Sequence, residues 1–296
     1  MIRKHLVTSF LFAAAAVVPA SSALANLIAY DPFLSGNIRE VGEYTAGTDM
    51  RTMGAAALGW AGTGGIDGFG ISHAGTTGNF QANAGGEDSA AVEYEQGGRM
   101  QWLGVGNFPF NRNLTRQLNP YVSTGTLWMS IMTNRLGWVQ PPNADNVTYA
   151  VGGFVDAAGN GLQVGYDDTA GDGAPDLVLR VNGVNELLAA DTVSSDNQLV
   201  IVRLDIDPAG DETISAWADP ATLALGAPDL TLTTDITSSL SPFTQSKYES
   251  PGQSGVVFWD EIRLATTFES VTGIPEPTAG VLALIAAAAC GRVRRG

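Results

Sequence analysis

Short β-rich runs separated by turn residues follow one another between positions 26 and 273. The clearest run, residues 199–206, reads LVIVRLDI and places Val200, Val202, Leu204 and Ile206 on one face of a strand. No stretch of this region repeats apolar residues at helical spacing between capping residues. Many short strands joined by tight turns predict an all-β chain folded as an antiparallel β-sandwich. Six further runs share this character: 127–133, 149–156, 162–166, 177–181, 213–218 and 256–264.

The residues between these runs are typical of turns. Asn182-Gly183 directly follows the run 177–181, and this dipeptide favours the two-residue hairpin turn because both positions accept a positive φ. Residues 158–161 (AGNG) and 208–211 (PAGD) have similar turn chemistry. The linker signals that usually separate domains are missing from 26–273, so a single domain is the simplest interpretation.

The first 25 residues have the pattern of a secretory signal. Arg3 and Lys4 precede an apolar stretch at 6–18, and Ala23-Leu24-Ala25 forms a small-x-small cleavage site. The alternative is a membrane anchor, for which the apolar stretch is too short. We therefore expect an N-terminal signal helix that signal peptidase removes.

The last 23 residues, 274–296, form a second addressing segment. A Pro-Glu-Pro tripeptide is followed by a short apolar run at 279–290 and then by an arginine cluster. Arginines beyond an apolar run hold it at the cytoplasmic side of a membrane, although this run is only marginally long enough for an anchor. An ordinary C-terminal anchor is the alternative. The motif comprises Pro275, Glu276, Pro277, Arg292, Arg294 and Arg295.

This arrangement resembles the PEP-CTERM sorting signal of Gram-negative bacteria. The resemblance implies that an exosortase-type membrane protease or transpeptidase recognises a short C-terminal apolar helix and removes the tail. It also implies transient membrane contact through the tail. Delivery to the cell surface, the outer envelope or the extracellular matrix would follow.

The charge of the remaining segment excludes one class of partner. The signal holds two basic residues and the tail three basic and one acidic, so 10 of the 15 basic and 29 of the 30 acidic residues lie in 26–273. A net charge of −19 argues against nucleic-acid binding, which needs a basic face. Lys247 is the only lysine of this segment. The only cysteine of the chain, Cys290, lies in the tail. The domain therefore has no disulfide and is expected to be stabilised by core burial.

Two short segments carry a second resemblance. Residues 260–264 (DEIRL) look like the final strand of laminin-G-like, concanavalin A-type jelly rolls, and residues 27–33 (LIAYDPF) look like their first strand. The resemblance implies that the first and last strands lie close together. This fold hosts lectins, glycosidases and structural modules, so it does not specify a ligand.

An acidic segment is the strongest candidate for metal binding. Asp167, Asp168, Asp172 and Asp176 fall within ten residues and could supply the hard oxygen ligands that Ca²⁺ prefers. The EF-hand pattern fits poorly, because its twelfth position would be Leu179. The favoured alternative is an acidic hairpin loop between the strands at 162–166 and 177–181.

Aromatic residues offer a different kind of site. Most are expected in the core, whereas Trp138, beside Pro141-Pro142 in a presumed loop, is the candidate for an exposed sugar-stacking platform. Catalysis is not expected, because Glu93-Tyr94-Glu95 lacks the third acid of a retaining glycosidase strand. The sequence thus predicts an exported, non-catalytic protein that binds carbohydrate or matrix. A purely structural envelope or biofilm protein is the alternative, and a glycosidase is a more remote one.

Overall fold

The computed structural model describes ten segments: residues 26–31, 69–71, 80–83, 99–104, 111–139, 149–169, 173–192, 196–236, 239–251 and 254–272. Within them nearly all regular structure is β-strand, with one short helix, α1 (Phe268–Thr272). No helix in these segments is long and apolar enough to cross a membrane. The expected signal helix (1–25), sorting tail (274–296) and C-terminal apolar helix lie outside the described residues.

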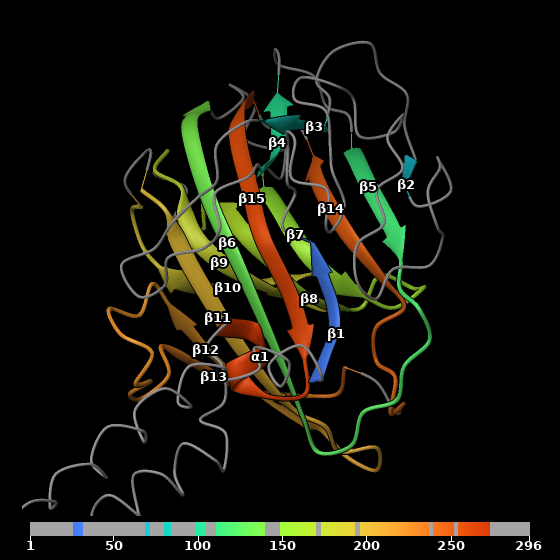
Figure 1. The fold of residues 1–296 in the computed structure, drawn as a ribbon. Coiled ribbons are helices and arrows are strands. Elements are labelled where there is room, and N and C mark those ends of the chain that lie inside the picture. The colour runs from blue at the N-terminus through green and yellow to red at the C-terminus, as the bar shows by residue number, and fades with distance from the viewer. Residues whose placement is uncertain are drawn as a thin grey trace, which may run out of the picture.

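The strands form two antiparallel sheets that pack face to face (Figure 1). The described part of the chain contributes eight strands to one sheet and seven to the other. The all-β antiparallel sandwich expected from the sequence is therefore confirmed. The eight-stranded sheet runs in the order β13 (Leu230–Thr234), β12 (Glu212–Ala218), β11 (Gln198–Asp205), β6 (Thr126–Val139), β15 (Ser254–Ala265), β4 (Arg99–Gly104) and β3 (Phe80–Asn83), with β1 (Leu27–Asp31) also paired to β15.

The seven-stranded sheet carries the surface on which the candidate site lies. Its centre is β7, which is flanked by β8 on one side and β14 on the other. The order is β10 (Val184–Ala189), β9 (Asp176–Val181), β8 (Gly161–Asp167), β7 (Tyr149–Val155), β14 (Gln245–Pro251), β5 (Asn111–Gln117) and β2 (Phe69–Ile71).

The first and last strands are neighbours, as the jelly-roll resemblance implied. Leu27 pairs with Ala265 and Asp31 with Ile262 in an antiparallel ladder, and Thr266 N–H donates to the Asn26 carbonyl (3.0 Å). In Figure 1 β1 lies alongside the lower half of β15. The domain is thus closed by a contact between its two ends.

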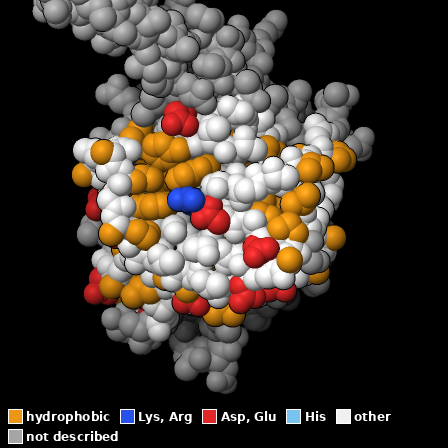
Figure 2. Space-filling model, turned by 90° about the horizontal axis from the view of Figure 1, so that it is seen from below, with side chains coloured by type: hydrophobic (Ala, Val, Ile, Leu, Met, Phe, Trp, Pro, Cys, Tyr) orange, Lys and Arg blue, Asp and Glu red, His pale blue; other side chains and the backbone are white. Residues whose placement is uncertain are grey.

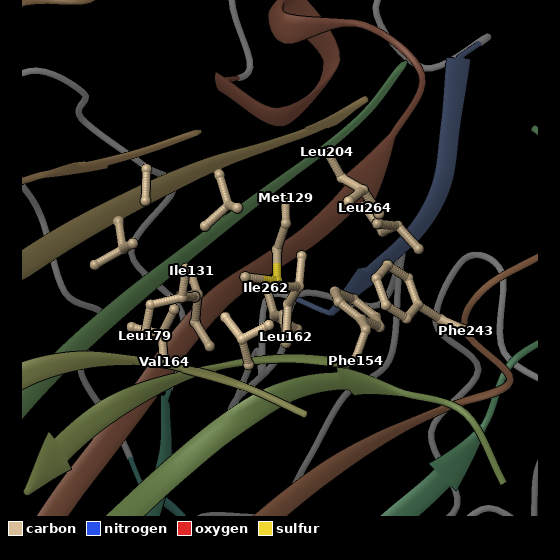
Figure 3. Packing of buried hydrophobic residues seen from close by; sticks show 14 of the residues in the cluster. Met129, Ile131, Phe154, Leu162, Val164, Leu179, Leu204, Phe243, Ile262 and Leu264 are labelled. Carbon is tan, nitrogen blue, oxygen red and sulfur yellow. The ribbon is translucent and has the colours of Figure 1, made fainter. Parts of the chain in front are cut away.

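The core lies between the sheets (Figure 3). Met129 and Ile131 from β6 point toward Leu162 and Val164 from β8, and these side chains are at most 1% exposed. The rings of Phe154 and Phe243 are tilted by 31° to each other, with their centres 6.2 Å apart. Removal of these apolar surfaces from water is the main stabilising contribution, at roughly 25 cal/mol per Å².

Strand β11 confirms the face read in residues 199–206. Val200, Val202 and Leu204 enter the core between the sheets as expected, and Ile206 packs against it. Leu199 and Ile201, on the opposite face, are also buried, in a second apolar cluster with Met132 and Trp217. Phe268 of α1 packs against this second cluster, so the outer face of the eight-stranded sheet is partly covered by the chain's own helix.

The hairpin between β9 and β10 confirms the expected turn. Asn182 and Gly183 have φ values of +48° and +85°, as the primed hairpin turn requires. Strand β10 itself was not anticipated from the sequence, nor were β13 and β14, because none of them has the continuous apolar run seen in residues 199–202.

Candidate functional site: a polar cluster on the seven-stranded sheet

Polar side chains converge on the outer face of the seven-stranded sheet, away from the core. Alternation along each strand sends Leu179 and Tyr248 inward and their neighbours Arg180, Lys247 and Glu249 outward. Cross-strand pairing places further polar residues on the same face. We call this group the outer-face cluster; it consists of Tyr149, Gln163, Asp167, Arg180, Asn185, Lys247 and Glu249.

Arg180 is the centre of the cluster. Its guanidinium carbon lies 4.1 Å from the centre of the Tyr149 ring, and its Nη1 donates to Asn185 Oδ1 at 2.8 Å. Its Nε lies 3.5 Å from Glu249 Oε1. A cation held by an aromatic face, an amide and a carboxylate has a fixed orientation, so its planar donors are positioned before any ligand arrives.

Arg180 reaches Glu249 by crossing the sheet. The two residues lie on β9 and β14, and strands β8 and β7 run between them. The outward positions along this path alternate between glycines, Gly165 on β8 and Gly153 on β7, and the side chains of Gln163 and Val151. A Cβ at Gly165 would lie 1.9 Å from the Ala150 carbonyl oxygen, so the neighbouring backbones also exclude a side chain there. The glycines leave room for long polar side chains to lie flat across the strands.

Glu249 connects the two cations of the cluster. Its Oε2 lies 2.6 Å from Lys247 Nζ, while Oε1 faces Arg180. The side chains of Arg180, Lys247 and Glu249 are 15, 19 and 10% exposed. Each carboxylate oxygen thus has a cationic partner in a partly desolvated place, where ion pairs are stronger than on an open surface.

Two amides and a second acid complete the cluster, and one of the amides, Gln163, is only 2% exposed. Asn185 Nδ2 donates to Asp167 Oδ2, and Gln163 Nε2 donates to the Lys247 carbonyl oxygen at 3.1 Å. Burial raises the pKa of the Asp167 carboxyl above its usual range, against the opposing effects of the Asn185 amide, the Asp168 N–H and Arg180. Neutral amides and carboxylates arranged together can donate to and accept from hydroxyl groups.

Tyr149 has a strongly shifted hydroxyl. Burial raises its pKa to about 12, and the nearby Glu249 carboxylate adds to the shift while Arg180 opposes it. The phenol is therefore protonated at neutral pH and acts as a hydrogen-bond donor with an apolar ring.

The acidic segment forms the hairpin loop between β8 and β9 that the sequence analysis favoured. Asp167 and Asp176 pair across the hairpin, and their carboxylates accept hydrogen bonds from nearby groups. Asp176 is 2% exposed; it accepts from Thr169 N–H at 3.1 Å and from Asp191 N–H at 3.0 Å. Asp168 Oδ2 accepts from Gly173 N–H at 2.9 Å. These carboxylates therefore hold the loop together.

The calcium hypothesis gains no support from this geometry. Asp172 lies outside the described residues, and within those residues no group of three or more His, Cys, Asp or Glu side chains is arranged to hold a metal ion. Asp167 instead belongs to the outer-face cluster through Asn185.

Trp138 lies in strand β6 and not in a loop, so that part of the prediction was wrong. It pairs with Gly255, and the strand continues to Val139 before Pro141-Pro142. Its side chain is outside the described part of the structure, and its role as a sugar platform stays a prediction. Trp259 and Trp217, 0% and 9% exposed, are core residues as expected for most aromatics.

Sequence reasoning missed the outer-face cluster. Lys247 stood out as the single lysine of the domain, and the alternation Lys247-x-Glu249 placed two charges on one strand face. Those were the only available signals. The partner Arg180 could be found only once the order of β9, β8, β7 and β14 was known.

Two packed antiparallel sheets closed by a pairing of first and last strands define a concanavalin A-like β-sandwich. No family model matches the sequence, and no curated protein matches it. Solved structures do resemble the fold. One is described as the cellulose induced protein Cip1 (TM-score 0.44, 14% identity, covering 75% of this chain and 94% of that one).

Two other similar structures are a calreticulin domain and a glucuronan lyase. The globular domain of T. cruzi calreticulin has a TM-score of 0.42 at 13% identity, covering 77% of this chain and 95% of that one. The endo-β-1,4-glucuronan lyase of the fungus Trichoderma reesei has a TM-score of 0.38 at 12% identity, covering 70% and 98%. These likenesses are distant and concern the fold alone, so the outer-face cluster has to be interpreted from its own residues.

Proposed function

We propose that this protein binds an uncharged polysaccharide through the outer-face cluster and does so without catalysis. The observation that carries the proposal is the convergence of planar hydrogen-bonding side chains around Arg180, beside the Tyr149 ring. Sugar hydroxyls both donate and accept, and they match amide, carboxylate and guanidinium groups held in fixed positions. Arg180 covers one face of the Tyr149 ring, which leaves the opposite face for the C–H surface of a sugar.

The charge distribution of the cluster favours an uncharged ligand. Arg180 and Lys247 both contact Glu249, so neither cation is left for an anionic sugar. Acidic side chains are spread over the face seen in Figure 2, where the basic group in view lies beside an acid. A domain of net charge −19 repels polyanions at long range.

The titration of Tyr149 supports a binding role. A phenol with a pKa of about 12 is a weak proton acceptor near neutral pH, where general bases need a pKa close to the working pH. Asp167 and Glu249 are already bound to Asn185, Arg180 and Lys247, an arrangement that suits hydrogen bonding to hydroxyls.

The sequence ends suggest where this binding takes place. The signal-like segment 1–25 and the motif of Pro275, Glu276 and Pro277 with its arginine cluster support export followed by exosortase-type sorting. We propose that the domain acts at the cell surface or in the extracellular matrix.

A glycan array and affinity electrophoresis in gels containing soluble uncharged polysaccharides test the proposal. Retardation by at least one such polysaccharide is expected, and Asn185→Ala should weaken it about fivefold or more, the loss of one hydrogen bond. Thr231→Ala, an exposed residue on the other sheet, is the matched control and should bind normally.

The same assay separates the alternatives. Absence of binding to every uncharged glycan, with and without added Ca²⁺, would reject the proposal and leave the structural envelope role. Release of shortened or unsaturated sugar products during the assay would show that the protein is an enzyme.

A further inference from the structure

We infer that Glu249 determines the ligand class of the outer-face cluster, acting as a built-in carboxylate that occupies the place of a uronate carboxylate. This inference rests on the proposed function of the same site. Without Glu249, Arg180 and Lys247 would form a receptor for acidic sugars. With Glu249 in place the site accepts uncharged sugars and rejects polyuronates.

The contacts of Glu249 are those that a bound carboxylate would make. One oxygen faces Arg180 Nε at 3.5 Å, and the other faces Lys247 Nζ at 2.6 Å. A carboxylate shared between a guanidinium and an ammonium is a common form of charge-assisted recognition. The side chain supplying it is 10% exposed and comes from the sheet itself, so a ligand cannot easily displace it.

Arg180 is held in position by groups other than Glu249, because it lies over Tyr149 and donates to Asn185. The pairing of β14 with β7 and β5 fixes the backbone of Lys247, whose ammonium contacts Glu249. Removal of the Glu249 charge should therefore leave the Arg180 guanidinium in place and release the Lys247 ammonium from Glu249. Their positive charge would then be available to a ligand.

Charge counting gives the direction of the effect. Arg180 and Lys247 are balanced within the cluster by Glu249 and Asp167. A neutral residue at 249 leaves the cluster with a net positive charge at contact distance. The acidic remainder of the surface acts over a longer range and is screened beyond about 10 Å at ordinary ionic strength.

The experiment compares one sugar backbone in two charge states. Binding of the full chain to polygalacturonate oligosaccharides and to their fully methyl-esterified form is measured by calorimetry, for wild type and for Glu249→Gln. Glutamine keeps the size of the side chain and an oxygen acceptor for Lys247. We expect Glu249→Gln to bind the acidic form at least about tenfold more tightly than wild type does, and the gain to shrink as salt rises.

Two variants control for charge and for mechanism. Glu186→Gln removes the same charge from β10, where Glu186 pairs with Leu179 and points away from the cluster, and it should give no gain. The double variant Glu249→Gln/Arg180→Gln should lose the gain. Circular dichroism and thermal unfolding check that each variant is folded. If Glu249→Gln does not fold, Glu249→Ser is used in its place.

The outcomes separate this inference from the proposed function. A folded Glu249→Gln that gains no affinity for polygalacturonate overturns the inference, as does an equal gain by Glu186→Gln. Wild-type binding of polygalacturonate as tight as that of its ester also overturns it. The proposed function fails separately, when wild type binds no uncharged glycan on the array.

Discussion

The guanidinium carbon of Arg180 lies 4.1 Å from the centre of the Tyr149 ring, although the two residues come from strands that are not neighbours in the sheet. The contact spans β8, whose outward position between them is Gly165. It links an aromatic ring to a cation that also contacts Asn185 and Glu249. Several measurable properties of the domain depend on this arrangement.

Tyr149 should titrate about two pH units later than an exposed tyrosine. Subtracting the 295 nm absorbance titration of Tyr149→Phe from that of wild type isolates its signal, and we expect a midpoint near pH 12. Because the folded pKa exceeds the unfolded value of 10.0, the contribution of Tyr149 to the free energy of unfolding falls as pH rises between these values. In Glu249→Gln the midpoint should move to lower pH, since a neighbouring negative charge has been removed. A difference midpoint near 10 in a chain still folded by circular dichroism would contradict the burial of this ring.

Asp167 should make the domain less stable as pH rises from the acid range. Its folded pKa is raised above 3.8 by burial, so the folded state holds more protons than the unfolded state between the two values. The free energy of unfolding then decreases across that interval and no further above it. Asp167→Asn should remove this slope while keeping an acceptor for Asp168 N–H. Thermal midpoints of both proteins from pH 3 to 7 give the difference, and parallel curves would refute the assignment.

Gly165→Ala should destabilise the centre of the seven-stranded sheet. A Cβ would lie 1.9 Å from the Ala150 carbonyl oxygen, and backbone cannot rotate away as a side chain can. We expect a loss of about 3 kcal/mol in the free energy of unfolding, measured by urea denaturation. Gly226→Ala is the control, because nothing lies within 4 Å of its added Cβ, and it should change stability by less than about 0.5 kcal/mol. Equal effects at the two positions would argue against the close strand approach.

Arg263→Met should be one of the more damaging substitutions in the last strand. Arg263 Nη2 lies 2.8 Å from Glu261 Oε2, and the two side chains are 11% and 1% exposed. Removal of the cation leaves a buried carboxylate without this partner, at a cost of about 3–5 kcal/mol. The double variant Glu261→Gln/Arg263→Met should recover a good part of that loss in a double-mutant cycle. Additive losses would mean that the pair is not energetically coupled.

The main features of the fold could be predicted from local patterns. Turn chemistry at Asn182-Gly183 identified a hairpin, and alternation in residues 199–206 identified one core-facing row. The pattern could not reveal the second buried face of β11, because Leu199 and Ile201 pack with Trp217 of the neighbouring strand and with Phe268 of α1, far along the chain.

The candidate site could not be predicted from the sequence for a related reason. Arg180 and Glu249 are ordinary charged residues of two separate strands, and only sheet order brings them within 3.5 Å. Trp138 was misplaced because Pro141-Pro142 suggested a loop, whereas β6 extends to Val139, two residues before Pro141. Pairing with β15 decides where β6 ends, and no local pattern encodes that partner.

The pairing of β1 with β15 has a kinetic consequence. Tyr30 and Arg263 are 233 residues apart in the chain, yet they meet in adjacent strands. Contacts between residues so far apart in the chain form slowly, because the entropy of closing the loop is lost before the contact contributes any stabilising free energy. A chain threaded from its N-terminus through a membrane would therefore hold β1 without its partner until almost the whole domain had crossed. If the protein is exported in this way, as proposed above, folding of the sandwich is completed at the end of export and cannot drive its early part.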